Sequence, residues 1–163
     1  MINWSEAMQQ TFEFYIVDPS TWKDKSKLDN VTSCRINRDE SNETLGSATI
    51  DCDSILDECY IRVYLVVIQN GETNKVPLGT FLVQTPSTDF DGKVMSTSLD
   101  AYTPLSELKD GLPPLGYSIL KDTEIMSLAT KICEEHMRAP VVGAKSTDKL
   151  YDDFVSNAND TWL

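Results

Sequence analysis

The segment from Cys59 to Pro86 constrains the fold more than any other part of this chain. Its first arm, residues 59–69, is rich in the β-branched and aromatic residues that suit a pleated sheet. Asn70-Gly71 then supplies two residues that tolerate positive φ, so the chain can reverse direction there. A second apolar arm follows. The pattern predicts a long antiparallel β-hairpin, and other strands must cover it because both of its faces carry apolar residues.

The two faces of the first arm differ in character, because alternate residues of a strand share a face. One face is purely apolar and is predicted to be core: Ile61, Val63, Leu65 and Val67. The other face begins with Tyr60, Arg62 and Tyr64, residue types that are enriched in protein interfaces. In the second arm, Pro77 cannot donate to a ladder, which predicts an edge, a bulge or the start of the strand at that position.

Short alternating segments flank the hairpin. Strands are predicted over residues 11–17, 31–38, 45–52 and 93–102. Turn signals such as Asp18-Pro19 and Asp91-Gly92 separate them, and the polar segment 22–30 is predicted to be a loop. Five or six strands at this spacing predict a sandwich or barrel, which makes residues 1–102 a mainly β (α+β) domain.

The pattern changes after residue 102. Thr103-Pro104 predicts the start of a short helix that stops at Gly111. A second helix is predicted over residues 124–137, where apolar residues recur at helical spacing until Pro140. Residues 103–163 are therefore predicted to be a helical extension of the β domain.

Charge excludes two classes of partner. The chain has 163 residues, a formal net charge of −12 and a pI near 4.4, and such a field repels nucleic acid and anionic membranes. We expect no transmembrane helix, since no apolar run reaches about 18 residues, and no signal peptide. The cysteines lack CxxC spacing and are expected to be buried thiols in a reducing cytoplasm: Cys34, Cys52, Cys59 and Cys133.

Catalytic signatures are weak. Cys133 and His136 are three residues apart on one helical face, so they could bind a metal or form a thiol–imidazole pair. The competing interpretation places both on the core side of the helix, and it is favoured because the chain has one histidine and no nearby partner cysteine. The acidic residues between Asp51 and Glu58 lack the glycine of an EF-hand loop. We predict no cofactor, no metal and no enzymatic activity.

Aromatic and arginine residues suggest a binding surface instead. The candidate partner interface consists of Trp22, Tyr60, Arg62, Tyr64 and Trp162.

Five segments resemble the N-terminal part of bacteriophage tail (baseplate) hub proteins. They are FYIVDPSTWKD (14–24), LGSATID (45–51), ECYIRVYLV (58–66), PLGTFLVQTP (77–86) and LDAYTPL (99–105). The resemblance implies an antiparallel β-barrel like that of tail-tube subunits. It also implies a homo-oligomer, a trimer in that family, that assembles with tail-tube and spike proteins in the virion tail after synthesis in the host bacterial cytoplasm.

The resemblance also bears on the chain's end, because hub proteins continue beyond the matching region. Residues 160–163 have the pattern of a helix N-terminus, a capping residue followed by apolar residues, but no further helical residues follow. We therefore expect the chain to be the N-terminal part of a larger hub. Trp162 and Leu163 should be frayed or held by another polypeptide.

Two alternatives stay open at this point. One is a carbohydrate-binding β-sandwich at the tail tip, with Trp22 and Trp162 stacking on sugar rings. The other is a thiol- or metal-dependent enzyme that uses Cys133 and His136.

Overall fold

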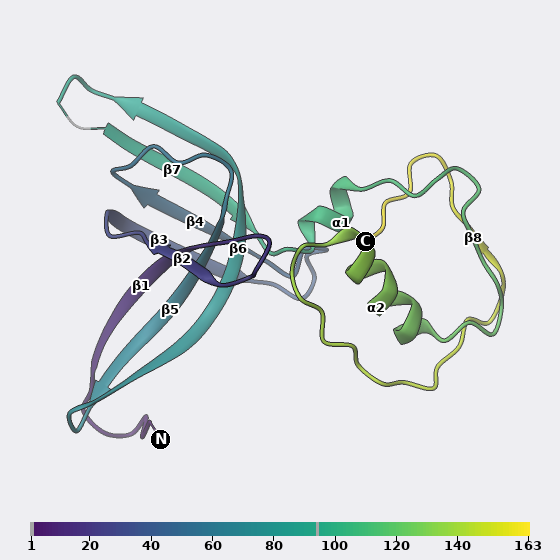
Figure 1. Ribbon diagram of the computed structural model, residues 1–163, viewed down its shortest axis with the longest axis horizontal. Coiled ribbons are helices and arrows are strands. Elements are labelled where there is room, and N and C mark those ends of the chain that lie inside the picture. The colour runs from purple at the N-terminus through teal and green to yellow at the C-terminus, as the bar shows by residue number, and fades with distance from the viewer. Residues whose placement is uncertain (1, 94) are drawn as a thin grey trace. The chain divides into compact units, whose positions relative to one another are not determined.

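The computed structural model describes residues 2–93 and 95–163 (Figure 1). The chain forms two compact units, the first ending at Thr103 and the second running over Pro104–Leu163. The first unit holds the sheet, and the second holds both helices. Each unit is described by itself below.

The first unit is built from one antiparallel sheet with seven strands in its described part. The strands are β1 Gln9–Val17, β2 Asp24–Lys27, β3 Val31–Arg38, β4 Gly46–Cys52, β5 Tyr60–Gln69, β6 Glu72–Phe90 and β7 Met95–Tyr102. They lie in the order β2-β1-β5-β6-β7-β4-β3. The long strand β6 pairs first with β5 and then with β7, so it joins the two halves of the sheet.

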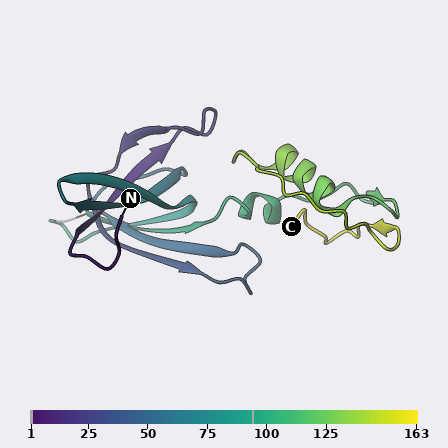
Figure 2. The ribbon, with the colours of Figure 1, turned by 90° about the horizontal axis from the view of Figure 1, so that it is seen from below.

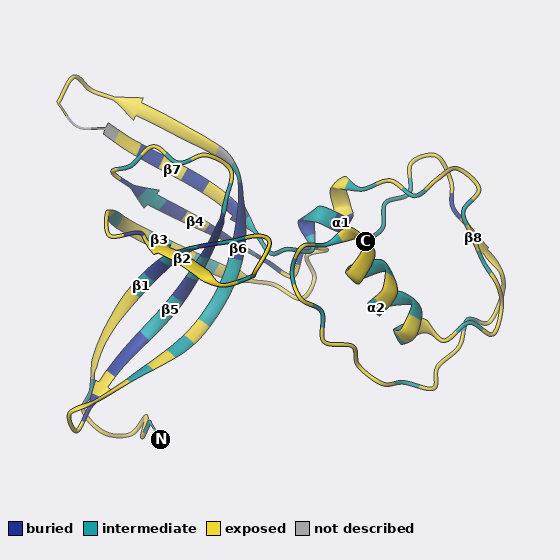
Figure 3. Cartoon of the chain, viewed as in Figure 1, coloured by how far each residue is buried: buried dark blue, intermediate teal, exposed yellow. Residues whose placement is uncertain are grey.

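The inner faces of the two halves meet in the core. Phe14, Ile61 and Phe81 come from one half, while Ile50 and Leu99 come from the other, and all five are buried in a single cluster. Figure 2 shows the purple strands β1 and β2 apart from the blue strands β3 and β4, and Figure 3 shows the buried residues along the middle of the sheet. Burial of these side chains provides the main stabilisation of the unit.

The mainly β, antiparallel fold with two helices is confirmed, but the expected closure into a barrel is wrong. Strands β2 and β3 are the two ends of the sheet, and no ladder joins them within residues 2–93 and 95–163. The physical reason is the short β2, which pairs only with Tyr15, Ile16 and Val17 of β1. The sheet is therefore open between β1 and β3.

The central hairpin forms as predicted. Asn70 and Gly71 both have positive φ, 52° and 80°, which suits the tight turn between β5 and β6. A bulge lies next to Pro77: Val63 is opposite Gly79, whereas the next residue of β5 is opposite Pro77. The proline therefore sits where the ladder is already interrupted.

Two local predictions are corrected. The segment 22–30 is not only a loop, because residues 24–27 form the edge strand β2. Leu65 is half-buried and does not belong to the buried core. Its neighbours across the sheet are Phe12 and Val76, and Phe12 is 54% exposed, so this apolar face is only partly covered at Leu65, although the next residues of β5, Val66 and Val67, are buried.

The second unit contains α1 Ser106–Asp110, α2 Ile125–His136 and a short antiparallel pair, β8 Ser118–Ile119 with β9 Phe154–Val155. Both predicted helices are present, and Gly111 is the C-cap of α1. No residue of α2 is fully buried. Among the described residues, none of the helices combines the length and apolar character that a membrane span needs.

The C-terminal end of the second unit is tied to its own chain. The backbone N–H of Trp162 donates to the carbonyl oxygens of Leu108 (3.1 Å) and Gly111 (3.2 Å). Its ring stacks on His136 with centroids 4.2 Å apart and meets the Tyr117 ring edge-on at 5.0 Å. The expectation that Trp162 is frayed or held by another polypeptide is therefore wrong.

Candidate interaction surface

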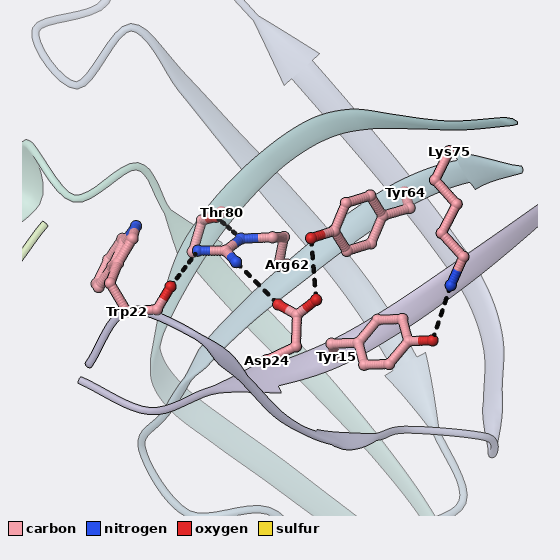
Figure 4. A network of polar contacts seen from close by, with 7 residues as sticks. All are labelled: Tyr15, Trp22, Asp24, Arg62, Tyr64, Lys75 and Thr80. Carbon is pink, nitrogen blue, oxygen red and sulfur yellow. Dashed lines mark hydrogen bonds and ion pairs between the residues drawn. The ribbon is translucent and has the colours of Figure 1, made fainter. Parts of the chain in front are cut away.

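Four of the five predicted interface residues gather on the outward face of the β2-β1-β5-β6 half of the sheet. They are Trp22, Tyr60, Arg62 and Tyr64, and Figure 4 shows three of them with their partners. The fifth, Trp162, belongs to the second unit. Residues 60, 62 and 64 are alternate residues of β5, so their side chains share one face of the sheet. Strand β1 pairs with β5, and β2 pairs with β1, which brings the segment around Trp22 to the same face.

Tyr60 lies beneath this surface. Its exposed fraction is 2%, and it packs with Val17 and Leu82 under Trp22. The Trp22 and Tyr60 rings meet edge-on, with centroids 4.9 Å apart. Tyr60 was predicted to be part of the partner interface, but its side chain is enclosed in a small apolar cluster on this outward face and is not available to a partner.

The loop before β2 holds Trp22 in place. The backbone of Trp22 has φ of 55° and its N–H donates to the carbonyl oxygen of Asp18 at 2.8 Å. The Asp18 carboxylate accepts hydrogen bonds from the backbone N–H groups of Ser20 and Thr21, and these bonds lower the pKa of Asp18. The predicted Asp18-Pro19 turn thus fixes the half-buried indole over Tyr60.

Arg62 connects β5 to three neighbouring segments. Its Nη1 pairs with Oδ1 of Asp24 at 2.8 Å, its Nη2 donates to the carbonyl oxygen of Trp22 at 3.1 Å, and its Nε donates to Oγ1 of Thr80 at 3.0 Å. The side chain is only 15% exposed. The guanidinium therefore holds the edge strand β2 and the Trp22 loop against the sheet, using its fixed donor geometry.

A tyrosine pair extends the surface toward the β5–β6 turn. Tyr64 donates its hydroxyl to Oδ2 of Asp24 at 3.0 Å and meets Tyr15 edge-on at 5.7 Å. The Lys75 ammonium donates to the Tyr15 hydroxyl at 3.1 Å and lies 5.1 Å from that ring's centroid. Tyr15 donates in turn to Glu13, which also pairs with Lys75.

Charge pairing holds both members of the Glu13–Lys75 pair in their ionised forms. The hydrogen bond from Lys75 is the largest cause of the lowered pKa of Glu13, and the hydrogen bond to Glu13 is the largest cause of the raised pKa of Lys75. This surface therefore keeps fixed charges across the physiological pH range. We refer to Tyr15, Trp22, Arg62, Tyr64 and Lys75 as the aromatic surface.

Sequence reasoning missed Tyr15, Asp24 and Lys75 as members of this surface. Tyr15 and Lys75 could have been found from the hairpin, since β1 and β6 are the strands beside β5. Asp24 could not, because it belongs to a segment predicted to be a loop. Its role depends on a long-range ion pair that no local pattern encodes.

The residues of the alternative hypotheses are engaged elsewhere. The Trp162 ring is stacked on His136, and the Trp22 ring covers Tyr60, so each indole already packs against its own chain. Burial raises the pKa of Cys133, which reduces the fraction of nucleophilic thiolate. Within the described residues, no three histidine, cysteine or acidic side chains are grouped as a metal site would require.

An apolar groove lies where the sheet fails to close, between β1 and β3. It has a volume of about 600 Å³. Its apolar lining includes Phe12, Phe14, Val31, Cys34, Ile36 and Leu78, and its polar residues are Thr11, Thr32 and Ser33. We refer to it as the β1–β3 groove.

Comparisons with known proteins identify the fold. No protein-family model and no curated protein sequence matches the chain. The structure is similar to the 43 kDa tail protein of prophage MuSo2 from Shewanella oneidensis, with a TM-score of 0.58 and 11% identity over 94% of this chain and 45% of that protein. A tail protein from Neisseria meningitidis MC58 gives a TM-score of 0.36 and 11% identity over 76% of this chain and 33% of its own.

The chain therefore shares its fold with the MuSo2 tail protein. It spans less than half the length of either tail protein.

Proposed function

We propose that this chain is a non-enzymatic structural component of a bacteriophage tail. The observation that carries the proposal is the fold shared with the MuSo2 tail protein across 94% of this chain. The five segments that resemble tail hub proteins also support it, and this support comes from the sequence. In the structure these segments lie on or beside β1, β4, β5, β6 and β7.

The proposal extends to a place in the tail. The chain acts in the baseplate hub, where it assembles with further copies of itself and with tail-tube and spike proteins. The resemblance to hub proteins supports this placement and a trimeric ring. The net charge of −12 fits a protein that borders a DNA passage without binding the DNA, because like charges repel.

The aromatic surface is the proposed contact with a neighbouring protein. Trp22, Arg62 and Tyr64 are already fixed by hydrogen bonds within the chain, so little conformational entropy is lost on binding. The exposed Lys75 ammonium, which is already paired with Glu13, lies beside two tyrosine rings, and charged groups beside aromatic rings suit the polar rim of a protein contact.

Immunogold electron microscopy of intact phage particles tests the tail assignment. Antibodies against this chain should label one end of the tail, as expected for a hub. Label distributed along the tail would retain a tail role but contradict the hub. Particles that carry no label, in a preparation where an antibody against the tail-tube protein does label, would overturn the proposal.

A binding measurement tests the aromatic surface. Lys75→Glu, and separately Tyr64→Ala, should weaken the association of the purified chain with the tail-tube or spike protein of the same phage. Lys93→Glu is the matched control, because Lys93 is an exposed lysine at the opposite hairpin turn. Equal affinities for all three variants and the original chain would exclude this surface as the contact.

A further inference from the structure

Strand β3 presents a complete unpaired edge to the β1–β3 groove. It pairs with β4 on one side, and no ladder reaches its other side within the described residues. Across the groove, residues 9–13 of β1 pair with β5, while β2 pairs with β1 only from Tyr15 onward. Exposed rows of backbone donors and acceptors are ready to pair with another strand.

A second unpaired edge lies at the far end of β6. The β5 ladder ends at Leu82, and the Val83 N–H still donates to the carbonyl oxygen of Cys59 at 2.8 Å. From Pro86 to Phe90, β7 is the strand that pairs with β6 among the described residues. Residues 86–90 are exposed, and Phe90 is 65% exposed. This two-stranded arm, residues 86–90 with 95–96, extends beyond β4, which reaches β7 only at Thr97.

The side chains of the arm alternate between two faces. Thr88 is opposite the buried Thr97, and their hydroxyls are 3.1 Å apart. Thr88 and Phe90 therefore share the face that continues into the core, while Asp89 is on the opposite face. In β3, Cys34 and Ile36 contact the core, and Arg35 lies exposed on the other face.

We propose that the arm of one copy of this chain pairs with the β3 edge of a second copy and fills its β1–β3 groove. An antiparallel register that sets Asp89 opposite Arg35 also sets Phe90 opposite Cys34 and Thr88 opposite Ile36. The aromatic ring of Phe90 then enters the apolar groove, and the charged pair stays on the solvent side. Such cross-strand pairs are the units that stabilise a sheet.

Charge supports a second copy as the occupant. Strand β3 carries Arg35 and Arg38 and no acidic residue, although the whole chain has a net charge of −12. The arm carries Asp89, and its basic residue, Lys93, lies beyond the strand in the turn. An acidic strand end and a basic strand edge therefore occur in one sequence, so each copy can supply both.

Strand direction supports the two-stranded arm. Following the sheet order, β3 and β1 run in opposite directions. A single inserted strand would be antiparallel to one edge and parallel to the other, whereas two strands keep every pair antiparallel. Because the arm and the groove are different surfaces, the contact is heterologous and closes into a ring when the rotation permits.

This inference does not depend on the tail assignment, because it rests on free edges, side-chain faces and charge. Its test is a specific cross-link. Phe90→Cys should form disulfide-linked dimers and larger species with native Cys34 under mild oxidation, since directly opposite residues bring their Cβ atoms within disulfide reach. The reaction is run near pH 9, because burial raises the pKa of Cys34 and the thiolate is the reactive form.

Two controls define the result. Phe90→Cys combined with Cys34→Ser should lose the cross-link, and Ser87→Cys, on the other face of the arm, should not form one. Cross-linking that persists without Cys34 would overturn the proposal, and so would an entirely monomeric Phe90→Cys protein.

Charge exchange tests the register without cysteine chemistry. Arg35→Asp or Asp89→Lys alone should weaken self-association by roughly three- to tenfold, as expected for an exposed cross-strand pair that becomes like-charged. The double exchange, Arg35→Asp with Asp89→Lys, should restore it. Analytical ultracentrifugation measures all three, and single variants that self-associate as well as the original chain, or a double variant that stays weak, would contradict the register.

Discussion

The two units of this chain are stabilised in different ways. In the first unit, the two halves of the sheet enclose side chains such as Ile50, Ile61 and Leu99, whose exposed fractions are zero. In the second unit, which the structure describes throughout, the fully buried residues are Ser106, Leu108 and Ser156. The helix α2 contributes none, although its sequence is amphipathic.

The difference shows that a helical pattern predicts a helix but not a core. In the second unit the stacked Trp162, His136 and Tyr117 rings and the two bonds from the Trp162 N–H take the place of a larger apolar interior. The first unit should therefore respond strongly to losses of apolar volume. The second should respond to the loss of particular contacts.

Removal of apolar volume should separate the units most clearly. Ile61→Ala should cost about 3 kcal/mol of the first unit's free energy of unfolding, because it leaves a cavity in a fully enclosed site. Leu128→Ala, in half-buried surroundings on α2, should cost about 1 kcal/mol or less. Urea unfolding followed by circular dichroism and by amide exchange in each unit checks this; equal losses would remove the distinction.

Loss of the Trp162 ring should affect the second unit alone. Trp162→Ala removes the stack on His136 and should cost about 2 kcal/mol, less than for a fully buried tryptophan. Amide protection of α1 and α2 should fall while that of β5 and β7 stays unchanged. Trp4→Ala, at a 59% exposed tryptophan, is the control and should change stability by less than about 0.5 kcal/mol.

Arg62→Ala should loosen one edge of the first unit. The variant loses the bonds to Asp24, Trp22 and Thr80, at a cost of about 1–2 kcal/mol. Amide exchange of residues 24–27 should quicken well before that of the buried strands. Arg62→Lys keeps the charge but not the three-way geometry, so it should show an intermediate loss; protection of β2 that is unaltered in both variants would contradict this role.

The smallest expected effect concerns pH. The pKa of Glu13 is lowered below its ordinary value of 4.5, chiefly by the hydrogen bond from Lys75. Glu13 therefore adds stability above pH 4.5, and this contribution is lost as pH falls through the lowered, folded-state pKa. Lys75→Met should flatten the acid side of the melting temperature profile of the first unit. A profile that is unaltered by the substitution would show that the pair contributes nothing measurable.

Local patterns in the sequence determined most of the elements. The alternation in residues 60–69, the Asn70-Gly71 turn and the missing donor of Pro77 each act within a few residues, so the hairpin and its bulge could be predicted. The two helices and the stop at Gly111 follow from the same kind of local signal. Strand alternation also put Arg62 and Tyr64 on one face, whereas the position of Trp22 beside Arg62 depends on a long-range contact.

Only the tertiary structure decided which apolar residues are enclosed and whether the sheet closes. Tyr60 is buried because the Trp22 loop folds back over it, and Arg62 is structural because Asp24 lies on the adjacent edge strand. The four residues of β2 are too few to extend along β1, so a groove remains where a barrel was expected. These outcomes depend on contacts between segments distant in sequence, and the period of a strand carries no information about which segments will meet.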